Sequence, residues 1–126
     1  MSLIVKKFGG TSLSSVGKIK NIAKHIADNS KNNRIIVVLS AMGKSTDQLI
    51  SLANKISKYP DPRDYDLLVS TGEQVSIALL SLALKELGVD CVAYTGWQAG
   101  IKTSRKHMSA RIKDINTSKI KNDLKK

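Results

Sequence analysis

The sequence has little cysteine, few aromatic residues and no long hydrophobic run. Its 126 residues include one cysteine, Cys91, which excludes an internal disulfide and indicates a reducing compartment, the cytoplasm. No stretch approaches the roughly 20 apolar residues of a membrane-spanning helix, so we expect no membrane association. Residues 1–8 hold two lysines and lead directly into two glycines, which does not fit a secretory signal peptide. The 41% hydrophobic content is that of a folded protein, and the length fits one domain or part of one.

Acidic residues are also scarce, and the basic residues are concentrated near the C-terminus. The chain has 21 Lys and Arg against 10 Asp and Glu, for a formal net charge of +11. Residues 102–126 contain nine of the basic residues and two of the acidic ones. Clustered cations attract nucleic-acid phosphates, but no aromatic side chain lies among them to stack on a base. We therefore expect a basic surface that attracts small anions, and not a nucleic-acid partner.

Short β-branched segments alternate with amphipathic segments along the chain. The periodicity predicts strands at residues 3–8, 34–40, 89–94 and 111–116, and helices at residues 16–26, 45–56, 63–69, 74–87 and 117–126. The run from Ile35 to Leu39 is apolar on both faces, as is typical of a buried parallel strand. This order of elements predicts an α/β fold with a mostly parallel sheet.

The first predicted strand ends in Gly9 and Gly10, just before a helix. Glycines at this point let the backbone approach an anion closely, and the free N–H groups of a helix start bind phosphate. Lys7 would add a positive charge at a transferring phosphoryl group. The same pattern also fits an ordinary tight turn with a surface lysine. The G-x-G-x-x-G spacing of dinucleotide-binding folds is absent.

A second group of candidates, residues 40–47, follows the second predicted strand. Gly43-Lys44-Ser45 resembles the end of a P-loop, but position 38, where that motif needs its first glycine, is Val38. A P-loop is therefore excluded. What remains is a second helix start at which Thr46 could bond a substrate, and an ordinary capped helix fits equally well.

A third candidate is Glu73, in the segment Ser70-Thr71-Gly72-Glu73 that opens the most apolar predicted helix. A carboxylate beside so apolar a segment needs a partner. It could complement the helix dipole or receive the ammonium group of a substrate, and the spacing does not choose between these roles.

The remaining reactive side chains give weak signals. His25 and His107 have no carboxylate or cysteine at the spacing of a metal site, so we assign no metal ligands. Cys91 lies in a predicted strand and is expected to be a small core residue. For Trp97 we favour a core position over a loop anchor.

Taken together, four sequence blocks resemble, in order, the N-terminal signatures of the aspartate kinases of the amino acid kinase superfamily. The blocks are Lys7–Ser12 (KFGGTS), Val38–Asp47 (VLSAMGKSTD), Leu68–Ser76 (LVSTGEQVS) and Thr95–Ile101 (TGWQAGI). The later segment His107–Ile112 is also similar, although in that family a glycine often follows the histidine, where this chain has Met108. The resemblance implies a three-layer αβα fold with a mostly parallel sheet.

The resemblance also implies a reaction: ATP-dependent phosphorylation of the β-carboxylate of L-aspartate to 4-phospho-L-aspartate, with Mg²⁺. Lys7 would be the catalytic residue that stabilises the transferred phosphoryl group. The residues expected to bind ATP and its phosphates are Lys7, Phe8, Gly9, Gly10, Ser12 and Ser40. Thr46 and Glu73 would bind aspartate, Glu73 by receiving its amino group. Full-length members of this family are homo-oligomeric.

Members of this family are several times longer than 126 residues. We therefore expect residues 1–126 to be the N-terminal part of an amino acid kinase catalytic domain, without the C-terminal half of that domain or the ACT regulatory domains, and inactive alone. Two alternatives stay open: a carboxylate kinase of the N-acetylglutamate or glutamate type, and a non-enzymatic basic binding module. The Thr95–Gly100 block and the setting of Glu73 favour aspartate.

Overall fold

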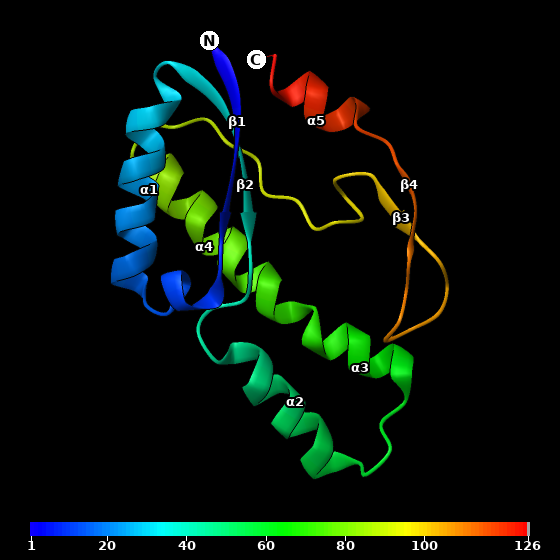
Figure 1. Ribbon diagram of the computed structural model, residues 1–126. Coiled ribbons are helices and arrows are strands. Elements are labelled where there is room, and N and C mark those ends of the chain that lie inside the picture. The colour runs from blue at the N-terminus through cyan, green and yellow to red at the C-terminus, as the bar shows by residue number, and fades with distance from the viewer. Residues whose placement is uncertain (126) are drawn as a thin grey trace.

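A pair of parallel strands organises the chain, whose residues 1–125 are described by a computed structural model (Figure 1). The elements in chain order are β1 (Ser2–Phe8), η1 (a 3₁₀ helix, Gly10–Leu13), α1 (Val16–Ser30), β2 (Asn33–Leu39), α2 (Ser45–Ile56), α3 (Pro62–Val69), α4 (Thr71–Glu86), β3 (Ile101–Thr103), β4 (Ile112–Ile115) and α5 (Ser118–Asp123). β1 and β2 pair in parallel from Ser2↔Asn33 to Phe8↔Leu39. The predicted α/β class with a parallel sheet is confirmed.

The core lies between the β1–β2 pair and the helices α1 and α4. Its buried apolar side chains come from η1, α1 and α4 and are Leu13, Ile19, Ala23, Ile26, Leu80 and Leu84. Alternate residues of β2, Ile35, Val37 and Leu39, pack against this core, as the two-residue period of a strand requires. On the opposite face, Leu3 and Val5 of β1 are 56% and 63% exposed. The parallel pair therefore has one covered face and one that is open to solvent.

The predicted strand at residues 89–94 is wrong. Residues 88–97, called segment 88–97 below, are irregular and pair with no strand in the described part of the chain. Gly88 ends the preceding helix in the left-handed region, with φ +76°, and its N–H donates to the Lys85 carbonyl at 2.9 Å. A strand depends on hydrogen bonds to a neighbouring strand, so a β-branched composition alone does not produce one.

The C-terminal third forms a separate antiparallel pair, β3 with β4, followed by α5. The strand predicted at residues 111–116 is confirmed as β4, but it lies outside the parallel sheet. The helix predicted at residues 117–126 is observed as α5, and residue 126 lies outside the described residues. Gly100 fits beside β4 because a Cβ there would lie 2.1 Å from the Asn116 carbonyl oxygen. The hairpin therefore depends on a glycine at position 100.

The helical stretch Pro62–Glu86, which combines α3 and α4, is long and apolar enough to span a membrane by length and composition, because an 18-residue window within it has a mean hydropathy of 1.6. The expectation that no stretch would meet this criterion is therefore wrong. A core helix of a soluble protein meets the same criterion. α4 buries Gly72, Ser76, Leu80 and Leu84 along one face against the core, while 22% of that window is buried in total.

Met108, in the loop between β3 and β4, provides a test of backbone strain. Its φ is +61°, a conformation that favours glycine, and its N–H donates to the Asp66 carboxylate at 2.9 Å, which holds the loop to α3. We expect Met108→Gly to raise the free energy of unfolding by about 0.5–1 kcal/mol, because the strain disappears and little buried surface is lost. Urea titration measures the change. Ser109→Gly is the control, because this neighbouring residue has no positive φ, and it should lower the free energy of unfolding by a few tenths of a kcal/mol. Equal changes in the two variants would show that the backbone at Met108 is not strained.

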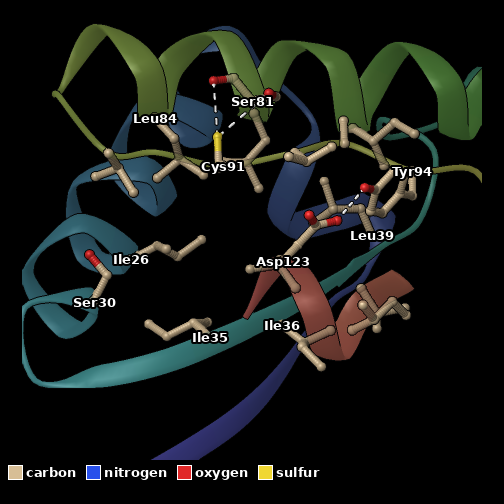
Figure 2. A pocket seen from close by; sticks show the side chains of 18 of the residues that line it. Ile26, Ser30, Ile35, Ile36, Leu39, Ser81, Leu84, Cys91, Tyr94 and Asp123 are labelled. Carbon is tan, nitrogen blue, oxygen red and sulfur yellow. Dashed lines mark hydrogen bonds between the residues drawn. The ribbon is translucent and has the colours of Figure 1, made fainter. Parts of the chain in front are cut away.

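Tyr94 links segment 88–97 to α5 (Figure 2). Its hydrogen bond leads us to expect that the stability of the chain depends on pH. Its hydroxyl donates to the Asp123 carboxylate at 2.5 Å; this hydrogen bond, followed by desolvation and the carboxylate charge, raises the pKa of Tyr94 above 10.0. Above about pH 10 the unfolded chain loses the phenol proton first, so the contribution of this contact to stability is present below pH 10 and is lost as the pH rises through the raised pKa. Thermal melting at about pH 9 and pH 11 should show a larger loss for the parent chain than for Tyr94→Phe. Equal losses of melting temperature in the two proteins would show that the contact between Tyr94 and Asp123 does not contribute to stability.

Candidate active site

Three segments meet at the carboxyl end of the parallel pair: the loop after β1, the loop after β2 and the start of α4. The Ser40 N–H donates to the Phe8 carbonyl at 3.1 Å, and the Gly43 N–H donates to the Gly10 carbonyl at 2.9 Å. From α4, the hydroxyl of Ser76 donates to the Ser40 carbonyl at 2.7 Å. Because Ser76 is fully buried, this bond holds the end of β2 against α4 away from water.

The two glycines after β1 have different surroundings. A Cβ at Gly10 would lie 2.9 Å from the Ala41 carbonyl oxygen and 3.1 Å from that of Gly43, so residue 10 must be glycine for the loops to touch. A Cβ at Gly9 would meet no atom within 4 Å. Gly10 therefore holds the two loops together, and the space beside Gly9 is open to a ligand.

The start of α4 lies close to the loop after β2 and to α2. A Cβ at Gly72 would be 3.0 Å from the Ala41 side chain and 4.0 Å from the Thr46 hydroxyl. Thr46 is half-buried in the first turn of α2, and Glu73 is half-buried in the first turn of α4. The structure therefore brings the two predicted aspartate-binding residues into neighbouring helix starts.

The other predicted residues occupy the edge around these helix starts. Lys7 is exposed and alternates with the half-buried Lys6 and Phe8, so it lies on the uncovered face of the sheet with Val5. The Phe8 side chain packs against the core, so its carbonyl is the part available to the site. Ser12 is exposed in η1. Among the described residues, no hydrogen bond or ion pair joins Lys7, Thr46 and Glu73 to one another.

The sequence interpretation missed two groups that support the site. Ser76 lies in the third sequence block without a predicted role, although small residues at positions 72 and 76, one turn apart, are a signal for close approach to a helix. Lys18 of α1 donates from Nζ to the Thr11 carbonyl at 3.1 Å, which places a second ammonium group beside the glycine-containing loop. Nothing in the spacing of Lys18 distinguishes it from the other lysines of α1.

The groups assigned no role lie elsewhere. His25 contacts the Lys6 ammonium group at 2.9 Å, and His107 contacts the Asp66 carboxylate at 3.0 Å. Trp97 is 81% exposed, so the preferred core position is wrong; it ends the irregular segment 88–97, which pairs with no strand in the described part of the chain. Cys91 is half-buried and packs against the core, as predicted. Within residues 1–125, no three His, Cys, Asp or Glu side chains are grouped closely enough to hold a metal ion.

The fold is that of an α/β protein, and the candidate ligand site lies beyond the carboxyl ends of its parallel strands, where backbone N–H groups and helix starts suit a phosphorylated ligand. The chain belongs to the amino acid kinase family, whose model matches residues 2–126.

Known proteins similar to this chain extend the comparison. Aspartokinase 2 of Bacillus subtilis is 58% identical, over 100% of this chain and 31% of its own length. The aspartokinase of Bacillus sp. strain MGA3 is 52% identical, over 98% of this chain and 30% of its own length. The crystal structure of aspartate kinase from Synechocystis superposes with a TM-score of 0.72 at 52% identity, over 79% of this chain and 17% of that one. The chain thus spans about a third of the length of the curated relatives that it matches.

The contrast between Gly9 and Gly10 gives a prediction about folding. We expect Gly10→Ala to lower the free energy of unfolding by about 2 kcal/mol or more, because the new methyl group meets backbone carbonyl oxygens that cannot move aside independently. Gly9→Ala, with φ −81° and open space around it, should change stability by less than about 0.5 kcal/mol. Urea titration of both variants measures the difference. If Gly9→Ala destabilises as much as Gly10→Ala, the packing of the two loops is not as described.

Proposed function

We propose that this chain is the N-terminal part of the catalytic domain of an aspartate kinase, which transfers the γ-phosphoryl group of ATP to the β-carboxylate of L-aspartate. The observation that carries the proposal is the convergence of the loop at Gly9, Thr46 of α2 and Glu73 of α4 at one edge of the sheet. The similarity to aspartokinases over the whole chain supports it. In the reaction, a carboxylate oxygen forms a bond to the γ-phosphorus as the bond from that phosphorus to ADP breaks.

The role of the loop after β1 is to position ATP phosphates. Open space beside Gly9 lets the phosphates approach the backbone, and Phe8, Gly10, Ser12 and Ser40 shape the surrounding edge. The ammonium group of Lys7 would compensate the charge on the phosphoryl group as it leaves ADP. Since two anions must approach each other in this reaction, most of the catalytic effect comes from positioning and charge compensation.

The role of the two helix starts is to hold the amino acid. The Glu73 carboxylate would receive the ammonium group of aspartate, and the Thr46 hydroxyl would donate a hydrogen bond to one of its carboxylates. Both side chains are half-buried, which strengthens their electrostatic interactions relative to those of fully exposed groups. This pairing of a carboxylate acceptor with a hydroxyl donor selects an amino acid with a free amino group, and argues against an N-acetylated substrate.

Mg²⁺ normally accompanies ATP in phosphoryl transfer. The described residues do not form a protein site for the ion, because no three carboxylate, histidine or cysteine side chains are grouped there. We therefore assign no step to the metal within this part of the chain.

The proposal also covers the compartment, the domain organisation and the assembly of the protein. We place it in the cytoplasm, as part of a longer polypeptide with the rest of the kinase domain and ACT regulatory domains, assembled as a homo-oligomer. On this proposal the 126-residue chain alone turns over no ATP, since it spans about a third of its relatives.

A chimera tests the activity and the role of Lys7. Residues 1–126 replace the matching part of Bacillus subtilis Aspartokinase 2, and ADP and acyl phosphate are measured with aspartate, glutamate and N-acetylglutamate. We expect turnover with aspartate and a loss of about a hundredfold or more in kcat for Lys7→Ala, because a charge at the phosphoryl group is removed.

Lys6→Ala is the matched control for this loss. Lys6 is the adjacent lysine, but its ammonium group contacts His25 on α1 and lies on the other face of the strand. We expect its kcat to stay within about twofold of the parent chimera. Turnover with another carboxylate in place of aspartate, or equal losses in both variants, would contradict the proposed function.

A further inference from the structure

Lys6 of β1 and His25 of α1 form a side-chain contact that the proposed reaction does not use. The Lys6 Nζ lies 2.9 Å from the Nε2 atom of His25. Lys6 alternates with the exposed Val5 and Lys7 along β1, so its side chain leaves the covered face of the sheet, on the side of α1. The contact therefore joins the amine of a half-buried lysine to an exposed imidazole on the neighbouring helix.

The hydrogen-bond partners of His25 define which ring nitrogen carries the hydrogen. Asn29, one turn further along α1, donates from Nδ2 to the His25 carbonyl at 2.6 Å, and the same Nδ2 lies 3.5 Å from His25 Nε2. The Lys6 amine and the Asn29 amide nitrogen are both donors, so the two groups that face Nε2 offer it hydrogens. These partners assign the ring hydrogen to Nδ1 and leave the lone pair of Nε2 facing the Lys6 amine.

No carboxylate competes for this pair. Among the described residues, neither Lys6 nor His25 forms an ion pair, and Asp28, the acidic residue nearest to His25 in the sequence, pairs with Lys31 at 3.0 Å. A carboxylate partner would stabilise the ammonium form of lysine, which is not a nucleophile. The imidazole is instead a base, and it lies within hydrogen-bond distance of the group that it would deprotonate.

We propose that Lys6 is a nucleophilic amine activated by His25, and that it is a site of acylation by small acyl phosphates. A nucleophile beside a base, with the base oriented by a third group, is the arrangement that produces a reactive side chain. Lys6, His25 and Asn29 fill these three positions. An acyl phosphate combines an activated carbonyl group with negative charge, which the net charge of +11 attracts to this chain. The proposal rests on this contact and not on the kinase activity.

The step forms an amide and releases phosphate. The Lys6 Nζ attacks the carbonyl carbon of the acyl phosphate, so that an N–C bond forms and the bond from that carbon to the phosphate oxygen breaks. The phosphate leaves with the electron pair of the broken bond. Nζ gives up two protons in total, and His25 Nε2 takes each of them in turn. One proton leaves with the product as hydrogen phosphate and the other passes to water, and nothing is oxidised or reduced.

Acetyl phosphate is the probe that tests this proposal on the 126-residue chain. Initial rates of acetylation at Lys6 and at Lys24 are measured by mass spectrometry in the same sample. Lys24 is the internal control, because it precedes His25 on α1 and is exposed, whereas Lys6 is half-buried. Exposure alone would make Lys24 the faster site. We expect Lys6 to react about tenfold faster or more. A rate at Lys6 equal to that at Lys24, or below it, would overturn the proposal.

Two histidine variants separate the base from the surroundings of Lys6. His25→Gln keeps a hydrogen-bond acceptor at an exposed helical position but removes the base, so the circular dichroism should not change. We expect the Lys6 rate to fall about tenfold or more, while the Lys24 rate stays the same. His107→Gln is the matched control, because His107 contacts Asp66 and not a lysine. It should leave the ratio of the two rates within about twofold of the parent. An unchanged ratio in His25→Gln would refute the role of His25.

Discussion

The parallel pairing of β1 with β2 sets the position of every group in the candidate active site. Because the register runs from Ser2↔Asn33 to Phe8↔Leu39, the two strands end level with each other. The loops that follow leave the same edge, and the Gly43 N–H reaches the Gly10 carbonyl. A shift of one residue would separate these partners and turn Lys7 toward the core, because side chains alternate along a strand. The position of the candidate site is thus a consequence of strand register.

Close backbone packing holds this edge together more than charge does. Gly10 and Gly72 allow approaches that any Cβ would block or strain, and the buried hydroxyl of Ser76 satisfies the carbonyl at the end of β2. The three ion pairs among the described residues are exposed or half-exposed contacts, which contribute little to stability. Neither Lys7 nor Glu73 takes part in these three ion pairs.

Local sequence patterns correctly predicted most helices and strands. They were wrong where the structure of a segment depends on residues that are distant in the sequence. Periodicity located β1, β2 and the helices. The patterns at their ends left the roles of Lys7, Thr46 and Glu73 open, and the resemblance to aspartate kinases assigned them. Segment 88–97 has the composition of a strand, but its state depends on whether another backbone lies beside it, which composition does not encode. Trp97 is large and apolar, yet its exposure is set by a loop that the core does not reach. The small residues at positions 72 and 76 indicate a close approach to α4, but the partner of Ser76 lies 36 positions away, so the spacing does not identify it.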